Sequence, residues 1–234
     1  MPATRKLLLF MHHLDLQMLK WYIWVKPDPT MKPSENRYFR ITELIAVAIT
    51  VALKFILMDW LGMRAFYIGG ICIFWLVYVV FRYSSDHSIL RYWGFKKENF
   101  GKSLRVLLPF LVISIIITII YGKLNHIRIL NYHVIPVLLL YPLWGIIQQF
   151  MLVCILVQNL LETAFFSSRK YRVILLASCL FSLIHYPYPA LMIFTFVMEM
   201  IFLIAYVKWR NLWAIGIAHG WIATFLLYYA LNRD

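Results

Sequence analysis

The sequence predicts an all-α protein, a polytopic transmembrane helix bundle of about seven spans with interfacial amphipathic segments. Of its 234 residues, 63% are hydrophobic and 14% are charged, and the mean hydropathy is +0.75. Soluble domains are nearer half apolar and one quarter charged, so the composition indicates a membrane-embedded chain. The length leaves room for one helical domain over residues 41–234, preceded by a basic, aromatic arm over residues 1–40.

The predicted arm alternates basic residues with aromatic or aliphatic ones, as in the run from Lys20 to Lys26 (KWYIWVK). This pattern is typical of an interfacial segment whose rings lie at headgroup depth while its lysines reach toward water. Pro27, Pro29 and Pro33 then end it. A short buried helix is the alternative interpretation.

Seven apolar stretches follow the arm, each near the roughly 20 residues that a bilayer-spanning helix needs. The fifth is shorter than the others and ends in Tyr186-Pro187-Tyr188-Pro189, a sequence that forces a break in a helix. The spans are expected over residues 41–58, 64–82, 104–121, 134–158, 171–186, 189–207 and 211–231.

The distribution of Lys and Arg predicts the orientation. Eighteen of these 23 residues lie in the arm and in or at the edges of the loops after spans two, four and six, whereas four lie toward the other side and Lys54 lies within span one. Basic loops stay in the cytoplasm, so the N-terminus is predicted to be cytoplasmic and the C-terminus external. The same rule explains the net charge of +13 and argues against a nucleic-acid partner.

Polar side chains interrupt four of the apolar spans. They are Gln148 and Gln149 in span four, His185 in span five, Glu199 in span six and His219 in span seven. Unpaired polar groups at membrane depth cost several kcal/mol, so such residues indicate a functional site by default. The predicted topology places them at comparable depths; His219, for example, lies about 12 Å into its span at helical rise. We therefore expect them to face one internal cavity.

Two of these positions lie in a recognisable pattern. Phe181-Ser-Leu-Ile-His185 and the later His219, preceded by Asn211 to Ala218 (NLWAIGIA), follow Gln148-Gln149 in order, each on its own predicted helix. Residues from about 100 to 231 thus resemble the CAAX-protease and bacteriocin-processing (CPBP/Abi) family of intramembrane endopeptidases. That family carries three motifs in order: Glu-Glu-x-x-x-Arg, then Phe-x-x-x-His, then His-x-x-x-Asn or a similar last residue.

The resemblance implies hydrolysis of a peptide bond in a membrane-associated protein, with a water molecule activated by a glutamate and histidines. Here Gln148 and Gln149 replace the two glutamates, Val153 stands at the arginine position, and Ala223 stands four residues after His219 where the family has Asn or a similar residue. An amide cannot accept the proton of the attacking water.

The expected catalytic residues are therefore His185 and His219, with Gln148 and Gln149 orienting the water and Glu199 as the replacement carboxylate. Glu199 has a structural alternative, a pairing with Lys54 or with a histidine. The histidines could likewise hold the bundle together by interhelical hydrogen bonds.

Other functions stay open at this stage. A catalytically weakened or inactive relative would bind a membrane peptide, confer immunity or act as a scaffold, and the Pro-broken fifth span could also belong to a transporter. No cofactor is assigned. A divalent metal such as zinc remains an option for the two histidines with Glu199, although no His-Glu-x-x-His helix is present. The expected partners are the lipid bilayer and a membrane-associated protein or peptide substrate, with no nucleic acid. Size and resemblance favour a bacterial inner membrane.

Overall fold

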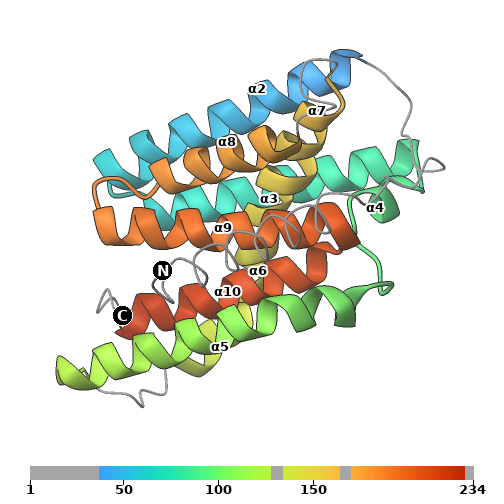
Figure 1. Ribbon diagram of the computed structural model, residues 1–234. Coiled ribbons are helices and arrows are strands. Elements are labelled where there is room, and N and C mark those ends of the chain that lie inside the picture. The colour runs from blue at the N-terminus through green and yellow to red at the C-terminus, as the bar shows by residue number, and fades with distance from the viewer. Residues whose placement is uncertain (1–36, 128–133, 164–169, 230–234) are drawn as a thin grey trace, which may run out of the picture.

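The computed structural model describes residues 37–127, 134–163 and 170–229, and in this part of the chain every regular element is a helix (Figure 1). The prediction of an all-α bundle is confirmed. In chain order the elements are α2 (Arg37–Leu53), η1 (Lys54–Trp60), α3 (Arg64–Ser85), α4 (Ile89–Tyr92), α5 (Phe100–Leu124), α6 (Val134–Gln149), η2 (Phe150–Val157), α7 (Gln158–Leu161), α8 (Lys170–Leu183), α9 (Pro189–Trp209) and α10 (Leu212–Tyr229).

Six helices of the described chain are long and apolar enough to cross a membrane. They cover residues Phe39–Trp60, Arg64–Ser85, Phe100–Leu124, Val137–Leu161, Pro189–Trp209 and Leu212–Tyr229. The predicted fifth span is the shorter helix α8, which has 14 residues and a length of about 21 Å. It ends before the Pro-containing turn that the sequence contains, and it packs along α9. The chain is an integral membrane protein.

The helices run back and forth along a common direction (Figure 1). The start of α2, the end of α3, and α4 lie at one end of the bundle, together with the starts of α5 and α10 and the end of α9. This end carries the loops predicted to be cytoplasmic. The predicted arm over residues 1–40 lies outside the described residues except for its last four, which begin α2.

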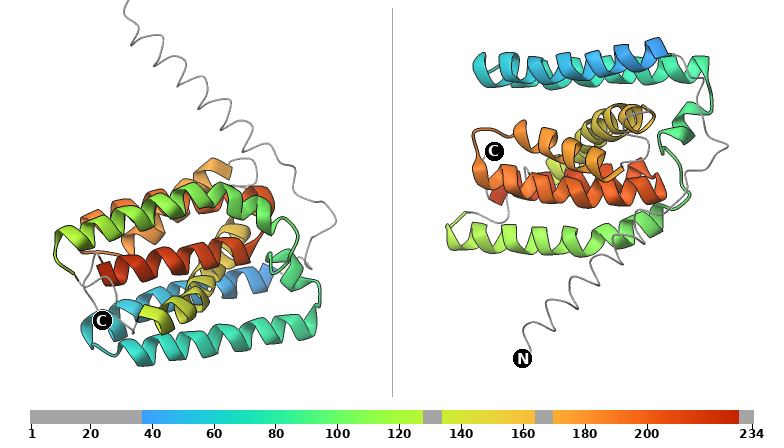
Figure 2. Two further views of the ribbon diagram at one scale, coloured as in Figure 1. Left: turned by 90° about the horizontal axis from the view of Figure 1, so that it is seen from below. Right: turned by 45° about the horizontal axis from the view of Figure 1, so that its top comes forward.

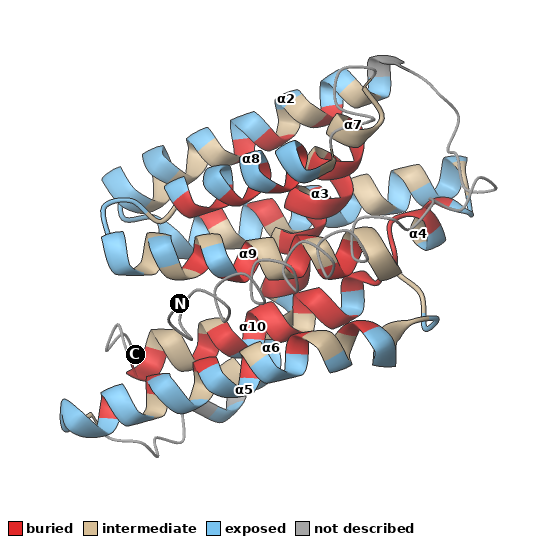
Figure 3. Cartoon of the chain, in the orientation of Figure 1, coloured by how far each residue is buried: buried red, intermediate tan, exposed pale blue. Residues whose placement is uncertain are grey.

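The bundle has an outer hairpin and a compact centre. Helices α2 and α3 lie side by side at one face, α5 lies at the opposite face, and η2, α8, α9 and α10 lie between them (Figure 2). Buried residues are concentrated in this central layer, while the outer faces of α2, α3 and α5 are exposed and apolar, as expected of helices in contact with lipid (Figure 3). The segment after α3 contributes to the centre as well, because Ile89 and Trp93 are buried.

Three glycines allow α6 and α10 to cross in close contact. A Cβ atom added to Gly145 would lie 2.5 Å from the carbonyl oxygen of Gly216 and 2.7 Å from the amide nitrogen of Gly220. A Cβ added to Gly216 would in turn lie 2.5 Å from a side-chain carbon of Ile146. Small residues spaced four apart let membrane helices approach closely, since van der Waals packing drives association in lipid. The crossing fixes how the next turn of each helix meets the other.

Candidate active site in the helix bundle

The close crossing brings Gln149 into contact with His219, and Glu199 of α9 contacts the same amide. Gln149 lies one turn after Gly145 on α6, and His219 directly precedes Gly220 on α10. The side-chain nitrogen Nε2 of Gln149 lies 3.0 Å from Nδ1 of His219 and donates a 2.8 Å hydrogen bond to Oε2 of Glu199 on α9. Residues from three helices therefore form one polar cluster.

The hydrogen bond from Gln149 determines the tautomer of His219. An amide nitrogen only donates, so Nδ1 of His219 must accept, and the proton of a neutral imidazole then lies on Nε2. Nε2 has no hydrogen-bond partner among the described residues. His219 thus offers an N–H donor to a group that enters the site.

The cluster is buried and its hydrogen bonding is incomplete. Gln149 and Glu199 are fully buried and His219 is 5% exposed. Oε1 of Gln149 and Oε1 of Glu199 are buried acceptors that have no hydrogen-bond partner among the described residues. Buried polar atoms are nearly always hydrogen-bonded, so each of these oxygens is suited to accept from a water molecule or a substrate N–H.

Aromatic rings surround the histidine of this cluster. The ring centroid of Phe181 on α8 lies 5.5 Å from that of His219, and the ring centroid of Phe202 on α9 lies 6.4 Å from it, both in edge-to-face arrangements. Directly after Gln149 the helix changes to the π-helical segment η2. Short π-helical stretches inside α-helices are frequent at functional sites.

His185 lies beside the cluster without a hydrogen bond to it. The imidazole follows α8, and its centroid is 5.2 Å from the Phe181 ring, which therefore contacts both histidines. Nδ1 of His185 lies 2.9 Å from the carbonyl oxygen of Phe181. Because a carbonyl only accepts, Nδ1 carries the proton and Nε2 of a neutral ring keeps its lone pair.

Gln148 differs from its neighbour. It is half-buried and makes no side-chain hydrogen bond in the part of the chain that the structure describes. Successive helical residues point in directions about 100° apart, which explains why only Gln149 reaches the cluster. The structure thus joins Gln149, Glu199 and His219, brings His185 close, and leaves Gln148 outside the hydrogen-bonded group.

The alternative pairing of Glu199 with Lys54 is wrong. Nζ of Lys54 lies 2.6 Å from Oδ2 of Asp59 and donates a 2.8 Å hydrogen bond to the carbonyl oxygen of Ile184. Glu199 instead contacts the amide of Gln149, which links it to His219. Because the amide is neutral, no ion pair with another described residue offsets burial of an ionised Glu199.

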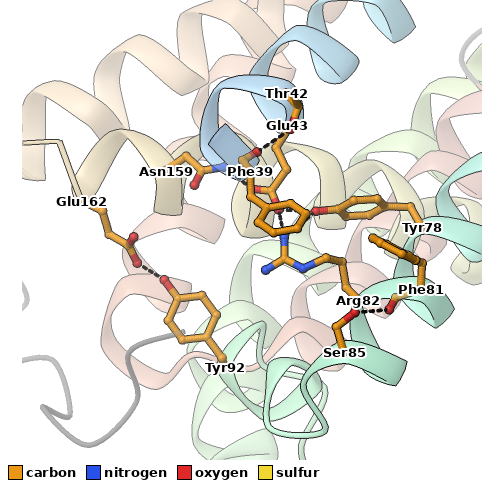
Figure 4. A network of polar contacts seen from close by, with 10 residues as sticks. All are labelled: Phe39, Thr42, Glu43, Tyr78, Phe81, Arg82, Ser85, Tyr92, Asn159 and Glu162. Carbon is orange, nitrogen blue, oxygen red and sulfur yellow. Dashed lines mark hydrogen bonds and ion pairs between the residues drawn. The ribbon is translucent and has the colours of Figure 1, made fainter. Parts of the chain in front are cut away.

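A second polar cluster, which was not predicted from the sequence, lies at the end of the bundle predicted to be cytoplasmic (Figure 4). The buried carboxylate of Glu43 accepts hydrogen bonds from Tyr78, Arg82 and Asn159, and Arg82 forms an ion pair with it. A carboxylate and an arginine, one in each of the first two spans, were the available signal, but only tertiary structure pairs them.

A neighbouring set of contacts lies between α4 and α7. Tyr92 donates a hydrogen bond to the carboxylate of Glu162, which also pairs with Arg40 at 3.1 Å (Figure 4 shows the tyrosine and the glutamate). Burial, and then the hydrogen bond to Glu162, raise the pKa of the Tyr92 phenol above its ordinary value. A small cavity of about 30 Å³ lies between the two sets of contacts. These contacts join the outer hairpin to the centre of the bundle.

The metal option finds no support in the geometry. Among the described residues there is no group of three or more His, Cys, Asp and Glu side chains that could hold a metal ion. His219 directs Nδ1 toward an amide, and Glu199 contacts that same amide. The donor set therefore does not fit a tetrahedral zinc site.

Fold and site together define a polytopic membrane protein with a buried amide, carboxylate and imidazole cluster in its helix bundle. Residues 130–225 match the family model described as type II CAAX prenyl endopeptidase Rce1-like. This match confirms the resemblance to the CAAX-processing family, and it contains all five predicted site residues. No curated protein and no solved structure was found to match the chain.

Proposed function

We propose that the chain is an intramembrane endopeptidase in which Glu199 takes the place of the missing first-motif glutamate. The observation that carries this proposal is the hydrogen bond between Gln149 and Glu199. Gln149 occupies a glutamate position of the motif, and Glu199 of α9 supplies a carboxylate in contact with it. A protein substrate in a lipid environment follows from the resemblance to the family, and the same resemblance together with the size of the chain favours a bacterial inner membrane.

The hydrogen bonds suggest a division of roles. Oε1 of Glu199 accepts a proton from a water molecule, whose oxygen attacks the carbonyl carbon of the scissile peptide bond. Nε2–H of His219 donates to the resulting oxyanion. The C–N bond then breaks, and the proton held by Glu199 passes to the leaving amine. The amide of Gln149 fixes the position of the Glu199 carboxylate relative to the His219 imidazole.

His185 is assigned a second role on the same substrate. Its hydrogen bond to the Phe181 carbonyl leaves Nε2 as an acceptor, so it is suited to orient the attacking water or the substrate amide. Gln148, which has no side-chain partner among the described residues, is suited to hydrogen-bond the substrate backbone. Since the Glu199 cluster is buried, cleavage requires the helices around it to part.

An exchange of the two side chains tests whether the carboxylate has moved between helices. The Gln149→Glu change alone places two carboxylates in contact and should abolish cleavage and lower stability. The double change Gln149→Glu with Glu199→Gln restores one carboxylate and one amide in the opposite order. We expect it to recover both folding stability and cleavage of membrane peptides relative to Gln149→Glu alone.

Two outcomes would contradict the proposal. If Glu199→Gln alone cleaves at the wild-type rate, Glu199 is not the base. If the exchange recovers stability but no cleavage, while wild type is active, the position of the carboxylate matters for more than hydrogen bonding, and the proposed equivalence is wrong.

A non-catalytic relative that binds a membrane peptide is the second candidate. The observation in its favour is that both amide hydrogens of Gln149 are already used and that the cluster is closed to solvent. Under this function, wild type cleaves no membrane peptide, but Gln148→Glu, which returns a carboxylate to the half-buried motif position, gains activity. Loss of wild-type activity in both His185→Ala and His219→Ala would exclude this candidate.

A further inference from the structure

The side chain of Lys54 extends from the outer hairpin to the turn that carries His185. Lys54 begins η1, and its ammonium donates a 2.8 Å hydrogen bond to the carbonyl oxygen of Ile184, a residue 130 positions away. The ammonium also pairs with Asp59 at 2.6 Å. The lysine side chain is only 18% exposed.

The bonded carbonyl belongs to the peptide unit that includes the nitrogen of His185. Carbonyl groups at the end of a helix lack partners within the helix, so the end of α8 needs acceptors satisfied from outside. Two such carbonyls have distinct partners here. The imidazole of His185 donates a hydrogen bond to the carbonyl oxygen of Phe181, and the ammonium of Lys54 donates one to the carbonyl oxygen of Ile184.

The contact is unlike the usual behaviour of a lysine near the end of a membrane helix. Such a side chain commonly extends along the helix toward the interface, where water and headgroups solvate the ammonium. The ammonium of Lys54 instead donates hydrogen bonds to the Asp59 carboxylate, five residues along the chain, and to a backbone carbonyl in the turn after α8. The contact therefore ties the position of the His185 turn to the α2–α3 hairpin.

We propose that Lys54 is a positioning residue for His185, holding the turn after α8 so that the imidazole keeps its hydrogen bond to Phe181 and presents Nε2 to the substrate. This proposal deepens the proposed function and rests on it for the catalytic role of His185. The structural part, the control of the imidazole by Lys54, does not require activity.

The first readout is therefore spectroscopic. The ¹⁵N chemical shifts of the histidine side chains, recorded on the full chain in detergent micelles and assigned with His185→Gln, distinguish the two neutral tautomers. Wild type should show the Nδ1–H tautomer at His185 and the Nε2–H tautomer at His219. Lys54→Met should give a mixture at His185 and leave His219 unchanged, and Lys54→Arg should restore the wild-type signal. Lys123→Met, on the exposed end of α5, serves as the matched control.

An unchanged His185 signal in Lys54→Met overturns the proposal. If Lys54→Met loses the signals of both histidines, the milder Lys54→Gln decides, because it keeps a polar group but is too short to reach Ile184 in the same way. A selective change at His185 supports the proposal, and no change rejects it.

The second readout is kinetic. With a cleaved membrane peptide, Lys54→Met should lower kcat by a factor on the order of 10 to 100, the cost of misplacing a catalytic group, with KM little changed and recovery in Lys54→Arg. An effect on KM alone would contradict positioning. If wild type cleaves nothing, the proposed function fails, whereas the histidine spectra still decide the role of Lys54.

Discussion

Gln149 and Glu199 are joined by a 2.8 Å hydrogen bond across two helices, although fifty residues separate them in the sequence. The same amide group contacts Nδ1 of His219 on a third helix. A single side chain thus connects the polar centres of α6, α9 and α10. It lies one turn beyond the glycine contact that sets the α6–α10 crossing.

Replacing the carboxylate by its amide separates catalysis from stability. Glu199→Gln should lower cleavage by about 10²- to 10⁴-fold, because the general base is lost. The unfolding free energy should stay the same or rise, since an amide costs less to bury than a carboxylate. Cleavage and thermal unfolding of the purified protein check both effects. Glu98→Gln, at an exposed ion pair with Arg91, is the control and should change neither.

The imidazole of the cluster should matter for folding as well as for activity. His219→Ala leaves one amide hydrogen of Gln149 buried without an acceptor, a cost of about 1–3 kcal/mol. We expect a lower unfolding temperature and loss of cleavage. His87→Ala, at an exposed histidine, provides the comparison. Equal unfolding temperatures for His219→Ala and wild type would show that the hydrogen bond from Gln149 does not stabilise the bundle.

The helix crossing predicts a contrast between glycines. Gly216→Ala places a methyl group against α6 and should destabilise the protein by about 1–3 kcal/mol through overpacking. It should also separate Gln149 from His219 and lower cleavage. Gly69→Ala on α3 meets open space and should be neutral or slightly stabilising. Reversible unfolding in mixed micelles measures both. Similar effects at the two sites would contradict the tight crossing.

The second polar cluster predicts a strong effect of one arginine. Arg82→Met leaves the carboxylate of Glu43 buried without its cation, which costs about 3–5 kcal/mol. Arg91→Met removes an exposed pair with Glu98 and should cost about 0–1 kcal/mol. The double change Arg82→Met with Glu43→Gln should recover part of the loss. Unfolding experiments that rank Arg91 above Arg82 would reverse this assignment.

The orientation in the membrane remains a prediction from charge. Seven alternating segments, α8 included, place the N-terminus in the cytoplasm and the C-terminus outside. A reporter that is active only in the cytoplasm should work when fused to the N-terminus and fail at the C-terminus. A reporter active only outside should give the opposite result. Both ends on one side would mean that one segment, with α8 the first suspect, does not cross.

Much of the architecture followed from local sequence. Apolar stretches with basic loops between them located every long helix in the described part of the chain, since a bilayer requires a minimum length of apolar helix and internal backbone hydrogen bonding. The fifth segment was expected to be short because prolines follow it, and α8 ends accordingly. The polar residues could also be found from the sequence, because a polar side chain within an apolar membrane span costs free energy.

Tertiary structure decided which polar residues contact one another. The sequence alone determined that this is a polytopic membrane protein with Gln148, Gln149, His185, Glu199 and His219 as site candidates, since hydropathy and spacing depend only on residue order. The packing of α6, α9 and α10 decided that Gln149 contacts Glu199 and His219 while Gln148 does not. Folding also paired Lys54 with Asp59 and the His185 turn rather than with Glu199. Contacts between helices depend on crossing geometry and rotation, which no single helix encodes.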